Sequence, residues 1–213
     1  MIPDDDIPQP TEPRNWRERL LFRAEEWIYD LNARDHWLFR LYDWGNEIWA
    51  RIAFRGVKRR GAAHRETIQG REHTALLRPL TLDDLDAFAA LLASFDFPYL
   101  PPHPLDRASA ERALRRASYL PYGMEQDGKL VGYALVRLFF PRRAATGVWG
   151  HVNEQTAGLG RAAVRSTAGF TRAEGIDDYV TVPLDNLPSL RGAQWAGWEV
   201  IRTNRHFHVL LRR

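Results

Sequence analysis

The sequence contains no cysteine among its 213 residues. Disulfides, thiolate nucleophiles, iron–sulfur clusters and cysteine-ligated zinc are therefore excluded, and any chemistry must use other side chains or the backbone. Lysine is scarce too, because Lys58 and Lys129 are the only two and nearly all cations are arginines. No apolar run reaches the roughly 18 residues of a membrane span, and the first residues are acidic and proline-rich rather than leader-like. These absences predict a cytoplasmic protein.

The charge balance is close to neutral, with a formal net charge of +3 and an isoelectric point near 9.4. Such a small excess gives no reason to expect a nucleic-acid partner. The cations are nevertheless concentrated in one run without acids, which holds Arg51, Arg55, Lys58, Arg59, Arg60 and Arg65. That run could face phosphates, anionic lipid or an acidic partner, but a solvated linker is the favoured interpretation.

Composition and periodicity divide the chain into four segments. Residues 1–13 are rich in proline and aspartate and predict a disordered tail. Residues 14–56 repeat apolar side chains at spacings of three and four, which predicts an amphipathic helical extension. Residues 57–73 are polar, basic and without a period, and are interpreted as a linker. Residues 74–213 are left for the compact domain.

The helical extension carries two apolar stripes. The first holds Trp16, Leu20, Ala24, Trp27 and Leu31, and the second holds Trp37, Leu41, Trp44, Ile48 and Ile52. A helical pair with so much aromatic surface must pack on something: the domain, a second copy in a homodimer, or a membrane surface. Packing on protein is favoured, because acids that anionic lipid would repel punctuate the arm at Glu18, Glu25, Glu26, Asp30, Asp43 and Glu47.

From Thr74 onward, the patterns predict the element order β-α-α-β-β-β-α-β-α-β-β. Thr81, three residues before Asp84, is expected to cap the first helix. Asp127-Gly128 predicts a tight hairpin turn. No internal repeat of solenoid length is present.

A glycine-containing loop, residues 155–161 (QTAGLGR), lies where a predicted strand leads into a predicted helix. Glycines allow a ligand to approach the backbone, and the amides of a helix start favour an anion, so the loop is a candidate phosphate site. Gly158 and Gly160 could equally serve only to turn the chain. A dinucleotide fingerprint is rejected, because Asp177 and Asp178 precede the next strand instead of following it.

The same loop resembles the cofactor motif of the GNAT N-acetyltransferase superfamily, Q/R-x-x-G-x-G/A, at Gln155, Gly158 and Gly160. The segments 186–189 (NLPS) and 196–198 (AGW) are similar to that family's second motif. The segment 77–84 (LRPLTLDD) is similar to its opening strand and helix, and 127–133 (DGKLVGY) to its central hairpin. The resemblance covers residues 74–213. It implies an α+β fold in α/β/α layers, with a mixed, mostly antiparallel sheet flanked by helices.

The resemblance also implies that acetyl-CoA is the acetyl donor and which residues hold it. The cofactor's pyrophosphate would lie on the loop amides, its pantetheine would pair with a strand edge, and an asparagine would contact its arm. The residues so assigned are Gly150, Val152, Gln155, Thr156, Ala157, Gly158, Leu159, Gly160, Arg161 and Asn186.

The catalytic groups follow the family pattern less closely. Many relatives carry a tyrosine acid where this sequence has Ala193, so another group or water must protonate the leaving thiolate. His151 and Glu154 are the candidate general bases, and His151 has the better-suited ordinary pKa. Tyr99, His103 and Tyr119 fall in or beside the region that caps the acceptor cleft in relatives. No metal site is expected, because His206 and His208 lack a third ligand.

The resemblance therefore predicts an acetyl-CoA-dependent N-acetyltransferase that acts on a primary amine. A helical arm before a short GNAT domain resembles bacterial enzymes of surface-polysaccharide synthesis, which favours a nucleotide-linked amino sugar as the small-molecule acceptor. Other small-molecule amines and protein amines stay open. The alternative from another class is a non-catalytic module that binds acyl-CoA or acts as a scaffold.

Overall fold

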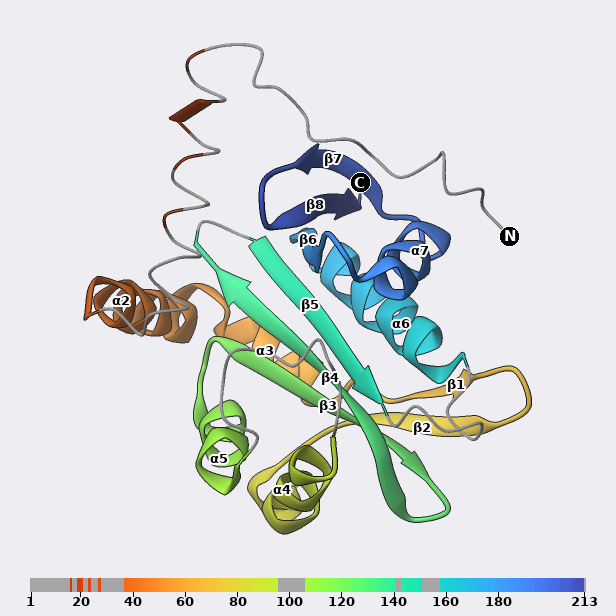
Figure 1. The fold of residues 1–213 in the computed structure, drawn as a ribbon. Helices are drawn as coiled ribbons and strands as arrows, with labels where there is room; N and C mark the ends of the chain where they lie inside the picture. Colours follow the sequence, from red (N-terminus) through yellow and green to blue (C-terminus); the bar gives the residue numbers. More distant parts are fainter. Residues whose placement is uncertain are drawn as a thin grey trace. The chain divides into compact units, whose positions relative to one another are not determined.

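The computed structural model (Figure 1) describes residues 16, 19–20, 23, 27, 37–95, 106–140, 143–150 and 158–212, with the backbone alone for 145–150 and 212. The chain divides into two compact units. One consists of Trp44–Tyr179, and the other of Met1–Asp43 together with Val180–Arg213.

An antiparallel sheet forms the centre of the unit Trp44–Tyr179. Its strands pair in chain order: β1 (Glu66–Gln69), β2 (Thr74–Pro79), β3 (Tyr119–Gln126), β4 (Lys129–Phe139) and β5 (Arg143–Gly150). On its other edge β5 pairs in parallel with the start of β6 (Asp177–Pro183), from Arg143 opposite Asp177 to Ala145 opposite Tyr179. The turn between β3 and β4 has positive φ at Asp127 (49°) and Gly128 (74°), as the Asp-Gly pair predicts.

Helices cover both faces of this sheet (Figure 1). They are α2 (Trp37–Ala53), α3 (Arg55–Gly61), α4 (Leu85–Ala93, preceded by the 3₁₀ turn Leu82–Asp84), α5 (Arg107–Arg115) and α6 (Leu159–Ala173). Along β4, Ala134 and Val136 enter a core with α2, α3 and α6, whereas Tyr133 and Leu135 enter one with α4 and α5. Because side chains alternate along a strand, β4 contributes to both cores, and the unit has three layers.

The unit that contains Val180–Arg213 also combines strands with a helix. The end of β6 leads into α7 (Leu187–Trp195), and β7 (Glu199–Thr203) forms an antiparallel hairpin with β8 (Phe207–Arg212). The strand order is β6-β8-β7. Trp198 and Leu210 are buried. Asn204 closes the hairpin turn, where its Oδ1 accepts from the amides of His206 and Phe207 at 2.9 Å each.

From Thr74 onward, the observed element order is the predicted one. The basic segment 57–73 differs from its interpretation as a linker, because it contains most of α3 and all of β1. Val57 and Ile68 are buried in the core, and β1 pairs with β2 from Glu66–Leu77 to Gln69–Thr74. The segment looked like a linker because its basic side chains outnumber the few apolar ones that turn inward.

The apolar stripe of α2 faces away from the domain, because Trp44, Ile48 and Ile52 are exposed. Packing of these side chains on the chain's own domain is therefore wrong, whereas packing on a second copy stays a prediction. The opposite side of the helix enters the core through the small side chain of Ala50, and Phe54 directly after the helix does the same. The described residues of the first predicted helix, which include Trp16, Leu20 and Trp27, are helical and exposed.

Polar side chains fix α2 in this orientation. Asn46 is buried, and its Nδ2 donates to the carbonyl of Leu138 at 2.9 Å while its Oδ1 accepts from the amide of Phe140 at 3.2 Å. Glu47 accepts from the amides of Ala117 and Ser118 at 2.7 and 3.0 Å. Burial by itself would raise the pKa of Glu47, but these amide donors outweigh it and hold that pKa below its usual value. The helix thus satisfies backbone groups at strand ends that would otherwise lack partners.

Replacing Glu47 with alanine should therefore destabilise the protein. The change leaves the amides of Ala117 and Ser118 without their acceptor, which costs about 1–3 kcal/mol for a buried donor. Urea unfolding measures the loss. The control is Glu111→Ala, which removes an exposed pair with Arg115 and should cost less than about 1 kcal/mol. Equal losses in the two variants would show that Glu47 does not anchor α2.

Candidate active site

The candidate site lies where β5 gives way to α6. The strand ends at Gly150, and the helix begins at Leu159. Between them, residues 151–157 lie outside the described part of the chain, and with them His151, Val152, Glu154, Gln155, Thr156 and Ala157. The parallel ladder between β5 and β6 covers three residue pairs, which end at Ala145 and Tyr179. Beyond that point, the edge of β5 over 146–150 has no ladder partner within the described residues of its unit.

Gly158 is the residue that turns the chain into α6. Its φ is +87° with ψ −17°, a left-handed conformation that side chains with a Cβ rarely adopt. A Cβ at this position would also lie 3.1 Å from the amide nitrogen of Arg71 and 3.4 Å from the Cα of Gly70. Gly158 therefore lies against the turn between β1 and β2, where its conformation favours glycine and its contacts leave little room for a side chain.

The first turn of α6 carries the amides that the sequence assigned to a phosphate. Gly158 precedes the helix and, as a glycine, provides no side-chain oxygen to cap the helix start. Leu159 is buried and anchors the turn in the core, while Gly160 is half-buried and Arg161 is exposed. The amides of a first turn and the positive end of the helix dipole together favour an anion.

A hydrogen-bonded group that the sequence did not reveal holds α6 in place. The Ser166 hydroxyl donates to the carboxylate of Glu66, which can only accept. Because the Ser166 hydroxyl has a single proton, its oxygen must accept from the Nε2–H of His64, at 3.1 Å. Burial lowers the pKa of His64, although the nearby Glu66 charge opposes that shift, and the ring also packs on Phe170 of α6.

A second interaction that holds α6 lies near the other end of the helix, where the Arg60 guanidinium forms a bidentate ion pair with Glu174. Both interactions join α6 to the segment 57–73. Ser166 and His64 are 102 positions apart in the sequence, and no local spacing indicates such a pair.

Two residues that the sequence analysis singled out, Asn186 and Ala193, belong to the unit that contains Val180–Arg213. Asn186 caps the start of α7, where its Oδ1 accepts from the amide of Ser189 at 3.2 Å. This cap leaves its amide nitrogen to serve as a donor. Ala193, at the place of the usual tyrosine acid, is buried in α7.

Of the three predicted acceptor contacts, only Tyr119 is described, since Tyr99 and His103 lie outside the described residues. Tyr119 is half-buried at the start of β3, with the guanidinium groups of Arg116 and Arg137 5.9 and 5.6 Å from its ring centre. Its carbonyl accepts from Lys58 Nζ at 2.6 Å. Lys58 of the basic run is thus used inside the domain.

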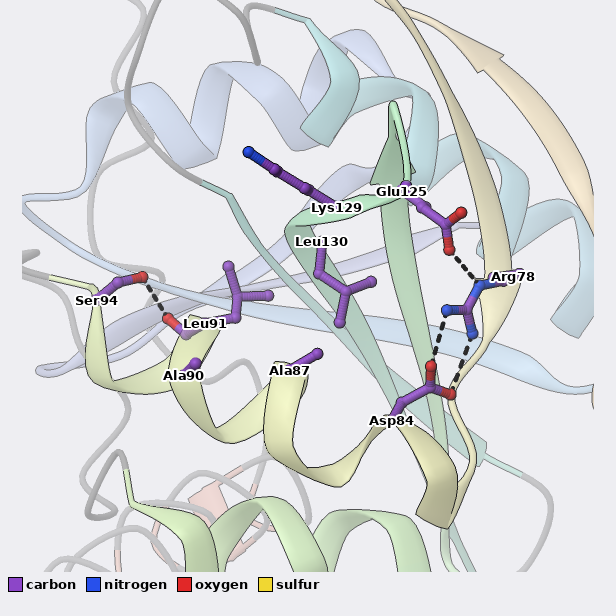
Figure 2. A pocket seen from close by; sticks show the side chains of 10 residues that line it. Arg78, Asp84, Ala87, Ala90, Leu91, Ser94, Glu125, Lys129 and Leu130 are labelled. Carbon is purple, nitrogen blue, oxygen red and sulfur yellow. Dashed lines mark hydrogen bonds and ion pairs between the residues drawn. The ribbon is translucent and has the colours of Figure 1, made fainter.

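A separate pocket lies between α4 and the β3–β4 hairpin, with a volume of about 480 Å³ (Figure 2). On one side, the Arg78 guanidinium lies between two carboxylates, 2.8 Å from Asp84 Oδ1 and 2.7 Å from Glu125 Oε2. The hydrogen bond from Arg78, more than any other contact, lowers the pKa of Asp84. Asp84 also accepts from the amide of Thr81 at 2.8 Å, which completes the predicted cap. These charges are engaged with one another and hold β2, α4 and β3 together.

Within the part of the chain that the structure describes, no three His, Asp or Glu side chains group as metal ligands do. No helix among the described residues is long and apolar enough to cross a membrane.

The model of the acetyltransferase (GNAT) family matches residues 85–198, which is more than half of the chain and runs from α4 to the end of the α7 region. The chain belongs to the GNAT acetyltransferase family. The predicted family is thereby confirmed, and membership makes the protein an acetyltransferase with acetyl-CoA as donor. No curated protein sequence matches this chain.

Solved structures confirm the fold. The GNAT domain of S. lividans PAT aligns with a TM-score of 0.61 at 15% identity, over 69% of this chain and 95% of that one. A GNAT-family acetyltransferase from Bordetella pertussis aligns with a TM-score of 0.53 at 20% identity, over 70% and 100%. PaiA N-acetyltransferase from Thermoplasma acidophilum, solved in complex with coenzyme A, aligns with a TM-score of 0.51 at 14% identity, over 64% and 97%. The predicted layers and the mostly antiparallel sheet are those of GNAT proteins.

The Arg78–Asp84 pair should make the stability of this GNAT protein depend on pH. The pKa of Asp84 is lower in the folded protein than in the unfolded chain, so its contribution is complete above the ordinary value near 4 and is lost as pH falls through the folded value. Asp84→Asn should lower the free energy of unfolding by about 2 kcal/mol at neutral pH and by less at pH 3. Urea unfolding at both pH values measures this.

The matched control is Asp83→Asn, one residue earlier and exposed. It should leave both values within about 0.5 kcal/mol of wild type, as surface substitutions do. A constant loss for Asp84→Asn across the pH range would contradict the assignment.

Proposed function

We propose that this GNAT protein transfers the acetyl group of acetyl-CoA to a primary amine, and that the end of β5 and the start of α6 hold the donor. The observation that supports it best is Gly158, a left-handed glycine at the uncapped start of α6, inside the residues that match the family.

The donor's phosphates would lie against the amides of Gly158 to Arg161 and of the preceding residues Gln155, Thr156 and Ala157. Backbone amides and the helix dipole would bind these phosphates without lysine, and the sequence has almost none. The pantetheine arm carries amides of its own. It would pair with the backbone of Gly150 and Val152, as an added strand does on an open edge. The amide nitrogen of Asn186 would donate to the same arm.

The reaction joins the amine nitrogen to the thioester carbonyl carbon and breaks the carbon–sulfur bond. The amine must lose a proton, and the leaving thiolate must gain one. We assign the first task to His151, which follows the last residue of β5 in the sequence, with Glu154 as the alternative base. Ala193 offers only a methyl group, so water or another side chain protonates the thiolate.

The acceptor that we propose first is a nucleotide-linked amino sugar, on the resemblance of the whole chain to enzymes of polysaccharide synthesis. Tyr119 is a candidate contact, together with Tyr99 and His103, because two guanidinium groups near its ring, those of Arg116 and Arg137, would suit an anionic nucleotide. Other small-molecule amines and protein amines are the competing acceptors.

Gly158→Glu tests the donor site. The new carboxylate would face the phosphates, and the left-handed backbone would be strained as well, so acetyl-CoA should bind about a hundredfold more weakly or worse by calorimetry. Gly175→Glu is the matched control, because Gly175 has φ +64° but open space around its Cβ position. Equal acetyl-CoA affinity in the two variants would rule out the assignment of the loop.

His151→Ala tests the base. The maximal rate should fall by about 10²–10⁴-fold, the acidic limb of the pH profile should disappear, and the affinity for acetyl-CoA should stay close to wild type. His73→Ala, a histidine in the turn before β2, is the control and should leave the rate unchanged. A His151→Ala rate within about threefold of wild type, with a large loss in Glu154→Gln, would transfer the role to Glu154.

A further inference from the structure

The exposed face of α2 is a feature that acetyl transfer does not use. Five apolar side chains form one stripe along it at helical spacing: Trp37 (64% exposed), Leu41 (55%), Trp44 (64%), Ile48 (42%) and Ile52 (75%). Soluble proteins seldom leave such a continuous apolar surface on one helix without a function, because its burial against a partner would be favourable.

The stripe cannot turn inward to be buried by its own domain. The opposite side of α2 already lies in the core through Ala50. On that side, Asn46 and Glu47 form hydrogen bonds with backbone groups at the ends of strands. Rotating the helix would break these hydrogen bonds and leave buried polar groups without partners. The outward direction of the stripe is therefore fixed by the fold.

The exposed charged side chains of α2 and α3 are of one sign. Asp43 and Glu47 are the only acids between residues 37 and 65, and the structure turns both away from the stripe, Asp43 buried and Glu47 bound to backbone amides. This removes Asp43 and Glu47 from the acids for which the sequence disfavoured a membrane, whereas Glu18, Glu25, Glu26 and Asp30 lie outside the described residues. The exposed charged side chains that follow the stripe are arginines, with Arg55 and Arg59 on α3 and Arg65 beyond it.

This charge pattern distinguishes between the partners. A second copy that packed stripe against stripe would bring arginine-rich flanks together, with no exposed acid on α2 or α3 to pair with them. An anionic lipid surface provides the complementary charge, and tryptophan is the side chain that best suits the boundary between headgroups and acyl chains.

We propose that α2 lies in the surface of an anionic phospholipid bilayer, with its stripe among the acyl-chain ends and the arginines of α3 on the headgroups. Such a helix lies in the plane of the surface and does not cross the membrane. The acetyltransferase would then act at the membrane surface.

Vesicle binding of the full chain tests this proposal. The protein should float with vesicles of phosphatidylcholine mixed with phosphatidylglycerol and bind phosphatidylcholine alone at least about tenfold more weakly, and added salt should weaken the binding. Trp44→Glu combined with Ile48→Glu should lower binding to the mixed vesicles by about tenfold or more. The control Leu82→Glu alters an exposed leucine outside α2 and should bind as wild type. Thermal unfolding of each variant verifies that the fold is intact.

The absence of cysteine allows a second readout. A polarity-sensitive dye on Ile48→Cys should shift to the blue on anionic vesicles, and the same dye on Leu82→Cys should not. Arg55→Gln with Arg59→Gln should remove most of the preference for anionic vesicles. A control with an equal loss of charge, Arg112→Gln with Arg115→Gln on α5, should keep that preference.

Two results would overturn the proposal. One is a folded protein that binds neither kind of vesicle. The other is a dimer in light scattering that Trp44→Glu with Ile48→Glu dissociates, without vesicle binding by the wild type; this would assign the stripe to a second copy of the chain.

Discussion

The left-handed backbone of Gly158, seated on the turn between β1 and β2, is the constraint on which the proposed donor site depends. It sets where α6 begins and therefore where the helix-start amides lie. A Cβ at Gly158 would meet the amide nitrogen of Arg71 at 3.1 Å, so this turn leaves little room for a side chain at the start of α6. Backbone groups that bind an anion must be held before the anion arrives, because ordering them during binding would reduce the affinity.

The segment before the family match is accordingly part of the site's support. The turn at Gly70 and Arg71 lies against Gly158, and His64, Glu66 and Arg60 hold α6 through Ser166 and Glu174. The same segment continues from α2, whose inner face satisfies strand-end amides and whose outer face carries the tryptophan stripe. One stretch of about forty residues thus connects the proposed membrane-facing surface to the proposed donor site through contiguous packing.

Much of the fold could be predicted from local sequence signals. The element order from Thr74, the Asp127-Gly128 turn and the start of α6 near Gly158 all follow from periodicity and glycine placement. The orientation of α2 could not be predicted, because Asn46 and Glu47 seem suited to solvent until the strand-end amides that they bind are known. The ties on α6 were missed for a similar reason, since His64 and Ser166 meet only in the folded chain. The catalytic candidates His151 and Glu154 stay predictions from the family resemblance.

The most direct test of the account is the release of CoA from acetyl-CoA by the wild-type protein, with a panel of acceptors. The panel would contain UDP- and dTDP-linked amino sugars, small-molecule amines and peptides with free amines. The account predicts turnover above the rate of spontaneous hydrolysis with at least one class, abolished by Gly158→Glu and retained by Gly175→Glu. Tight binding of acetyl-CoA without CoA release across the whole panel would contradict it and would favour a module that binds acyl-CoA without catalysis.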